Sequence, residues 1–174
     1  HLRKLPGELE LEERLRLIDQ AAGLGAVTYD VVGAGEPTID PHLFTQIEYA
    51  RDKGMIPVVF TNGFVLNEEM VERLWNANAT VVVKWHSKDW SKHDEMVHKK
   101  GAGERRDNAL KLLMDRGFNK TRPTRLAMDN IIYQKTIDEI PDWLRYCRKN
   151  NIFMVCSTFI PAGRTQKGNE TESA

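Results

Sequence analysis

The residues GAGEP, at positions 33–37, place a carboxylate beside two glycines directly after an apolar stretch. Glycine lets the backbone approach a ligand closely, while Pro37 fixes the turn and holds Glu36 in an extended conformation. Backbone carbonyls with one carboxylate suit a cationic group such as an ammonium, whereas the carboxylate would repel a phosphate. The plainer alternative is a tight turn in which Glu36 is a solvated charge.

Three further apolar stretches end in polar or glycine-rich residues. These endings are TNG at 61–63, KWHS at 84–87 and PAGR at 161–164. In parallel α/β sheets, ligands bind outside the carboxyl ends of the strands. If each stretch is such a strand, the four endings meet on one rim and form one candidate site.

Strands and helices alternate in the apolar pattern. Strands are predicted over 26–32, 55–60, 79–87, 124–133 and 152–160, and helices over 9–24, 41–53, 105–116 and 138–150. Asn67 is placed to cap a further helix, Gly54 and Gly117 to end the helices before them, and Pro141 is tolerated in a first turn. Residues 89–106 form a polar segment that could line the opening of the site.

This alternation predicts an α/β fold with a parallel sheet covered by helices. A leading helix with no strand before it is an awkward start, so we expect a strand and loop upstream of His1. The expected organisation is a core over residues 1–164 and a polar tail or linker over 165–174, leading toward a missing C-terminal region.

Composition narrows the class of protein and its partners. Lys and Arg number 25, and Asp and Glu also number 25, so neither a nucleic-acid surface nor an anionic membrane is expected as partner. No apolar run approaches the roughly 20 residues that span a bilayer. Cys147 and Cys156 form no disulfide framework, which predicts a reduced, cytoplasmic setting. Both thiols are expected to be buried or half-buried rather than ligands.

Several motifs together resemble the radical S-adenosylmethionine (radical SAM) superfamily. GAGEPTIDP resembles its Gly-Gly-Glu-Pro signature, with Ala34 where the first glycine is usual, and VFTNG follows about one strand–helix unit later. The first helix and the segment TIDEIPDWLRYCRKNNI are also similar, in the expected order. FIPAGR resembles the Gly-Arg ending of members with a C-terminal auxiliary-cluster (SPASM-type) extension.

The resemblance implies a partial (β/α)6 barrel whose first strand and cluster loop are missing. The Cys-x3-Cys-x2-Cys loop that binds a [4Fe–4S] cluster is absent and would lie before His1. We therefore expect the cluster in the full-length protein but assign no metal ligand in this chain. Cys147 and Cys156 have the wrong spacing and lie late in the sequence.

The implied activity is reductive cleavage of S-adenosylmethionine. One electron from the reduced cluster gives methionine and a 5′-deoxyadenosyl radical, which abstracts a hydrogen from the substrate. The Gly-Arg ending hints at peptide or cofactor maturation. The implied partners are a small-molecule or peptide substrate and an electron donor such as flavodoxin or ferredoxin.

By the same resemblance, residues of the first two strand endings bind the cofactor. The backbone of Ala34, Gly35 and Glu36 would receive the methionine ammonium, and Pro37 would shape the turn. Thr61 and Asn62 would border the methionine or the ribose.

Later strands supply four more candidates. Lys84 would meet the cofactor carboxylate or instead extend to solvent, and Ser87 competes for this role if the register slips. Asn130, expected to point inward, would contact the ribose or adenine, unless it only forms a turn. Arg164 would contact the cofactor or lead into the next domain.

Other polar and aromatic residues are expected to be structural. His42, His93 and His98 lack metal-ligand spacing and are predicted at the surface, and Trp85 and Trp90 are predicted to pack in the core or a loop. Two alternative functions stay open. One is another α/β-barrel enzyme in which Glu36 and Lys84 act as an acid/base pair on a small metabolite. The other is a non-catalytic ligand-binding domain with the same fold.

Overall fold

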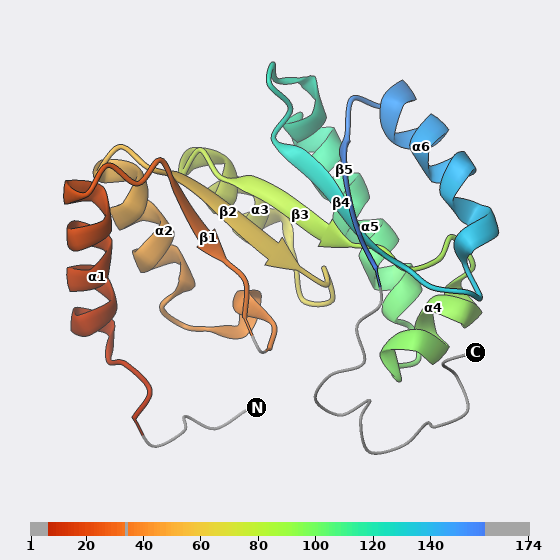
Figure 1. Cartoon of the computed structure of the whole chain (residues 1–174), viewed down its shortest axis with the longest axis horizontal. Coiled ribbons are helices and arrows are strands. Elements are labelled where there is room, and N and C mark those ends of the chain that lie inside the picture. Colours follow the sequence, from red (N-terminus) through yellow and green to blue (C-terminus); the bar gives the residue numbers. More distant parts are fainter. Residues whose placement is uncertain (1–6, 34, 159–174) are drawn as a thin grey trace.

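Five parallel strands form one sheet in the order β1-β2-β3-β4-β5 (Figure 1). In this computed structural model the structure describes residues 7–33 and 35–158. The strands are β1 Thr28–Val31, β2 Ile56–Thr61, β3 Thr80–Lys84, β4 Leu126–Ile132 and β5 Phe153–Thr158. All five predicted strands are confirmed, and the sheet curls into a half-barrel, as the predicted α/β partial barrel requires.

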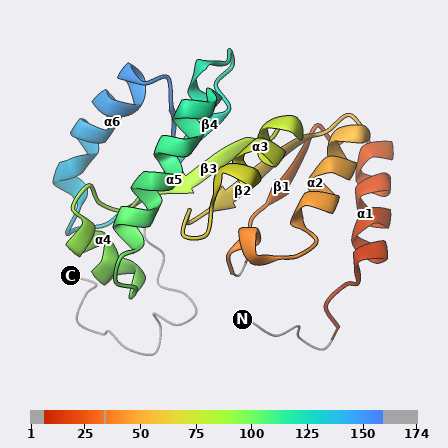
Figure 2. The same cartoon turned by 180° about the vertical axis from the view of Figure 1, so that it is seen from behind.

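Helices cover one face of the sheet, as the view from behind shows (Figure 2). They are α1 Leu11–Gly23, α2 Leu43–Asp52, α3 Glu68–Asn76, α4 Trp90–Val97, α5 Ala102–Arg116 and α6 Ile140–Lys149. Short 3-10 turns occupy Pro37–Ile39, Phe118–Lys120 and Ile137–Glu139. In the part of the chain described here, no helix has the length and apolar character that crossing a bilayer requires.

Local sequence signals set the helix ends. The Asn67 side chain accepts a hydrogen bond from the Met70 amide at 2.9 Å, so it caps α3 as predicted. Gly54 and Gly117 follow α2 and α5 with φ of +85° and +104°, a conformation that favours glycine. Pro141 lies in the first turn of α6, where its missing N–H costs nothing.

The main core lies between the sheet and helices α2, α3, α5 and α6. Each fully buried large apolar side chain there contributes about 1.5–3 kcal/mol. Strands alternate their side chains between faces, so one set of strand residues faces this core. Members of the core include Leu43, Ile47, Val59, Leu74, Val81, Val83, Leu113, Leu126, Met128 and Trp143.

The polar segment 89–106, for which no helix was predicted before Arg105, is largely helical. Residues 90–97 form α4, and α5 begins at Ala102 rather than at Arg105. The Asp89 side chain caps α4 by accepting hydrogen bonds from the Ser91 and Lys92 amides at 2.8 and 3.2 Å. The pattern missed α4 because among its eight residues only His93 is buried, which leaves no apolar stripe to detect.

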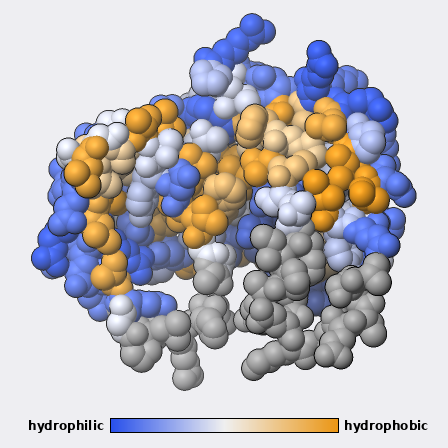
Figure 3. Space-filling model, viewed as in Figure 1, coloured by the Kyte–Doolittle hydropathy of each residue, from blue (hydrophilic) through white to orange (hydrophobic). Residues whose placement is uncertain are grey.

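The opposite face of the sheet is not covered by helices (Figure 1). Apolar side chains gather over the strands on this side in the space-filling view (Figure 3). Val32, Ile56 and Phe153 are 61%, 42% and 62% exposed on this inner face of the half-barrel. Cys147 is buried as predicted, but Cys156 is exposed, because β5 is the last strand in the described sheet.

Candidate functional site

The Glu36 carboxylate joins the carboxyl ends of β1 and β2. Its Oε1 accepts hydrogen bonds from Thr61 Oγ1 at 2.6 Å and from the amide and hydroxyl of Thr38 at 3.2 and 2.6 Å. Its Oε2 accepts the Asn62 amide at 2.7 Å. GAGEP and TNG are therefore brought together on the rim. A carboxylate offers about four acceptor positions, so Oε2 retains one for a ligand.

The loop after β2 packs tightly against α5. Gly63 has φ of +73°, and its amide donates to Thr61 Oγ1 at 3.0 Å. A Cβ atom on Gly63 would lie 2.8 Å from the Cβ of Ala109. The glycine of TNG is therefore required both by its backbone conformation and by the close approach of α5.

Replacing Gly63 with alanine is expected to destabilise the protein by about 2–4 kcal/mol, because a left-handed backbone and a steric clash add together. Gly54→Ala is the matched control, since Gly54 has φ of +85° but open space around its Cβ position. Gly54→Ala should lower the free energy of unfolding by only about 1–2 kcal/mol. Urea unfolding of both variants measures the difference, and equal losses would contradict the proposed clash with Ala109.

Lys84 and Asp129 lie side by side on the inner face. They are register partners on β3 and β4, and they alternate with Val83 and Met128, which face the helix-covered core. Both are half-buried. Among residues 7–33 and 35–158, neither side chain has an ion pair within 4 Å. Burial raises the pKa of the Asp129 carboxyl, and the Lys84 ammonium partly offsets this rise.

His86 and His93 stack at the end of β3, with ring centroids 5.5 Å apart and planes at 20°. Both are buried, so the surface position predicted for His93 is wrong; α4 folds it back against β3. Burial, with Lys84 and Arg106 nearby, lowers the pKa of His86 to about 4. Burial, with Arg106 and His86 nearby, lowers the pKa of His93 to about 3. Both imidazoles are therefore neutral at neutral pH.

Arg106 of α5 stabilises the loop that follows β3. Its side chain is fully buried, its Nη1 donates to the Ser87 carbonyl at 2.7 Å, and its guanidinium lies 3.7 Å from the centroid of the Trp85 ring. Its Nε and Nη2 donate to Asp107 Oδ1 at 3.0 and 2.8 Å. The sequence analysis missed Arg106 because a helical arginine gives no sign of burial before the fold is known.

Ser87 is fully buried, and its hydroxyl is already engaged. Ser87 Oγ donates to the Glu139 carboxylate at 2.9 Å and accepts the Asp89 amide at 3.1 Å. Glu139 also accepts the Lys88 amide at 2.9 Å. Ser87 therefore ties the loop after β3 to the turn before α6, and of the two competing candidates Lys84 is the one with an available polar group.

Asn130 does not point inward. It is 1% exposed, its Nδ2 donates to the Trp85 carbonyl at 2.7 Å, and it borders Met128 and Cys147 on the helix-covered side. The inward residue is Asp129, one position earlier, because adjacent strand residues face opposite sides. Trp85 packs in the core as predicted, whereas Trp90 is 49% exposed and donates to Asp107 Oδ2 at 2.7 Å.

Of the other candidates, Gly35, Pro37 and Asn62 lie on the rim beside Glu36, with open space around the Gly35 Cβ position. Ala34 and Arg164 lie outside the described residues. Within 7–33 and 35–158, no group of three or more His, Cys, Asp or Glu side chains could hold a metal ion.

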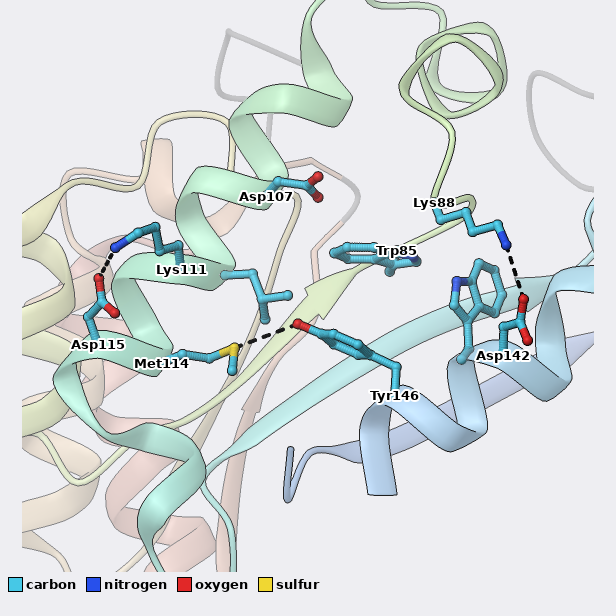
Figure 4. A pocket seen from close by; sticks show the side chains of 10 residues that line it. Trp85, Lys88, Asp107, Lys111, Met114, Asp115, Asp142 and Tyr146 are labelled. Carbon is cyan, nitrogen blue, oxygen red and sulfur yellow. Dashed lines mark hydrogen bonds and ion pairs between the residues drawn. The ribbon is translucent and has the colours of Figure 1, made fainter. Parts of the chain in front are cut away.

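A separate hollow of about 610 Å³ lies between α5 and α6 on the helix-covered side (Figure 4). Trp85 and Tyr146 line it, and the Tyr146 hydroxyl lies 3.8 Å from Met114 Sδ. Its rim charges are paired with one another: Lys88 with Asp142 at 3.0 Å, and Lys111 with Asp115. This hollow is mainly apolar, and these charged residues form ion pairs with one another. The rim at the strand ends differs, because Lys84 there has no ion-pair partner among the described residues.

Comparison with known families decides the superfamily of the chain. The sequence profile described as "Radical SAM superfamily" matches residues 1–147. The chain belongs to the radical SAM superfamily. Enzymes of the radical SAM superfamily use S-adenosylmethionine and a [4Fe–4S] cluster, so the strand-end rim is where a cofactor contact is to be sought.

Curated radical SAM relatives are moderately similar. The PqqA peptide cyclase of Granulibacter bethesdensis is 28% identical over 138 residues, which is 79% of this chain and 35% of that protein. The AdoMet-dependent heme synthase of Methanosarcina barkeri is 25% identical over 170 residues, 97% of this chain and 47% of that protein. The chain thus spans less than half the length of these relatives.

Solved radical SAM structures share the fold. Streptococcus suis SuiB bound to S-adenosylmethionine matches with a TM-score of 0.79 at 16% identity, covering 98% of this chain and 38% of SuiB. A second SuiB structure, bound to the precursor peptide SuiA, matches with a TM-score of 0.75 at 16% identity, covering 91% of this chain and 34% of SuiB.

The residues present fit the amino-acid end of S-adenosylmethionine. Lys84 offers a half-buried ammonium without an ion-pair partner among the described residues, which suits a carboxylate. The open backbone at Gly35 and the spare position on Glu36 Oε2 suit an ammonium. Groups that suit the two opposite charges of the ligand thus lie at the carboxyl ends of β1 and β3.

Proposed function

We propose that the chain is the core of a radical SAM enzyme that reductively cleaves S-adenosylmethionine and abstracts hydrogen from a peptide or a cofactor precursor. The observation that carries the proposal is the set of hydrogen bonds joining Glu36 to Thr61 and Asn62, because it brings the two cofactor motifs together at one strand edge. The peptide cyclase and the heme synthase among the relatives support these two substrate classes.

Each residue of the rim has a distinct part in this function. Glu36 and the Gly35 backbone bind the ammonium, and Lys84 binds the carboxylate, which orients the sulfonium. The iron–sulfur cluster, when bound, supplies the electron that cleaves the carbon–sulfur bond. The apolar inner face excludes water from the reacting atoms, and Asp129, the register partner of Lys84, lies beside it there.

Domain organisation and partners complete the proposal. We assign residues 1–164 to the core and 165–174 to a polar linker. The electron donor is a flavodoxin or a ferredoxin, and the substrate is a peptide or small molecule. In SuiB, one structure holds a precursor peptide, which supports a peptide as the first substrate to test.

The test uses the full-length protein, reconstituted anaerobically with iron and sulfide, reduced with dithionite and supplied with S-adenosylmethionine. We expect 5′-deoxyadenosine and methionine, quantified by chromatography with mass detection. Lys84→Met should raise the KM for S-adenosylmethionine about tenfold, because a charge-assisted contact contributes roughly 1.5–3 kcal/mol. The matched control is Lys88→Met, whose ammonium pairs with Asp142 on the other side of the sheet.

Two results would reject the proposal in different ways. Absence of 5′-deoxyadenosine from a protein that carries its full cluster would exclude reductive cleavage and favour a ligand-binding role. Equal KM values for Lys84→Met and Lys88→Met would leave the cleavage activity standing but remove Lys84 from the cofactor site.

A further inference from the structure

Beyond the cofactor site, the turn between α4 and α5 carries a concentrated positive charge. Lys99, Lys100 and Arg105 are exposed there, and we refer to them as the basic patch. Among residues 7–33 and 35–158, none of the three has a carboxylate within 4 Å, although the whole chain is formally neutral. Glu104 is the acidic side chain on the same surface.

Two nearby acids, Asp94 and Glu95, do not neutralise the basic patch, because their carboxylates have other partners. Asp94 turns toward the start of α5 and accepts the amides of Gly101 and Gly103, the latter at 2.8 Å. These amides lower the pKa of the Asp94 carboxyl. Glu95 pairs with Lys135 at 3.3 Å. Among the described residues, these contacts leave the three cations without a carboxylate partner.

The basic patch adjoins the candidate cofactor site through Phe64. The Lys99 ammonium lies 3.3 Å from the centroid of the Phe64 ring, and the Arg105 guanidinium lies 5.0 Å from it. Phe64 is two residues after Asn62, and its amide donates to the Asn62 side chain at 2.8 Å. Phe64 and Arg105 also line a polar hollow of about 320 Å³, which could accept a side chain of a partner.

We propose that the basic patch docks an acidic electron-transfer protein beside the cofactor site. This inference rests on the proposed function. Unpaired like charges at a surface steer an oppositely charged partner and raise its association rate, and the effect falls with ionic strength. When the iron–sulfur cluster is bound, the donor would be oxidised by one electron and the cluster would be reduced by it, and no atom would be transferred.

The first test measures binding and does not depend on turnover. Isothermal titration of the full-length protein with a flavodoxin of net negative charge gives the Kd at low and at high salt. The triple variant Lys99→Glu, Lys100→Glu, Arg105→Glu should raise the Kd at low salt about tenfold or more, because each exposed pair contributes modestly and the three act together. The Kd of the triple glutamine variant should lie between the values of the wild type and the triple glutamate variant. High salt should reduce the difference in Kd among the three proteins.

The matched control reverses two exposed cations elsewhere, with Arg148→Glu and Lys149→Glu at the end of α6. It should leave the Kd close to that of the wild type. Circular dichroism checks that all variants are folded. If the triple glutamate variant and the control bind flavodoxin equally at low salt, the docking proposal is wrong.

The second test separates this inference from the proposed function. Formation of 5′-deoxyadenosine driven by reduced flavodoxin should slow about tenfold in the triple glutamate variant, while formation driven by dithionite stays unchanged. No product with dithionite in the wild type would defeat the proposed function alone, and the binding measurement would still decide the docking. Slowing with both reductants would show damage to the cofactor site and would count against the docking role.

Discussion

Acidification from pH 7 to pH 4.5 is expected to lower the free energy of unfolding by on the order of 5 kcal/mol through His86 and His93. Both have folded-state pKa values, about 4 and about 3, below the unfolded value near 6.5. In this pH range the unfolded chain therefore binds more protons than the folded protein. The contribution of the two neutral histidines to the free energy of unfolding is fully present above pH 6.5 and declines as the pH falls. Below about pH 3 the two histidines cause no further loss.

Thermal unfolding at several pH values measures this slope. A loss of this size should lower Tm by roughly 10–20 °C for a chain of this length. His86→Gln and His93→Gln, which cannot titrate, should flatten the slope between pH 6.5 and pH 4.5. Carboxylates held at low pKa, such as Asp94, act at lower pH and do not obscure this window. An unchanged slope in the double glutamine variant would show that the stacked pair does not titrate as expected.

Arg106→Met is expected to destabilise the protein by about 3 kcal/mol. The change leaves the Ser87 carbonyl without its buried donor and removes the contact with the Trp85 ring, while methionine fills most of the volume. Arg105→Met on the same helix is the control. Because Arg105 is exposed, that change should alter stability by no more than about 0.5 kcal/mol.

The same variant also tests the histidine electrostatics. Arg106 is one cause of the low pKa of both His86 and His93, so its removal should raise both values. The acid-dependent loss of stability should then be smaller in Arg106→Met than in the wild type. Urea unfolding at pH 7 and pH 5 measures both effects. A full-size pH slope in this variant would mean that Arg106 does not contribute to the two low pKa values.

Much of the fold could be predicted because the strands are short, apolar and bounded by glycine or polar endings. Three consecutive valines, Val81 to Val83, indicate a buried strand, and TNG correctly marked the end of the strand before it. The failure at α4 had a different origin. Its stability comes from the Asp89 cap and from the burial of one histidine, and neither produces a periodic pattern.

Within the candidate site, only the residues that belong to local sequence motifs could be predicted. Glu36, Thr61 and Asn62 could be expected together because each follows a strand in a parallel sheet. The choice between Asn130 and Asp129 depends on strand register, which a single sequence does not contain. Because Lys84 lies opposite Asp129, the register places Asp129 on the inner face of the half-barrel and Asn130 in the helix-covered core.

Glu36 also makes two loops, 26 positions apart along the chain, depend on one acceptor. The Asn62 amide can exchange its hydrogen with solvent only when its contact with Glu36 opens. A molecule that holds the first loop in place would therefore slow hydrogen exchange at the second, even without touching Asn62. The amide of Asn62 is thus a built-in reporter of occupancy at the neighbouring strand end.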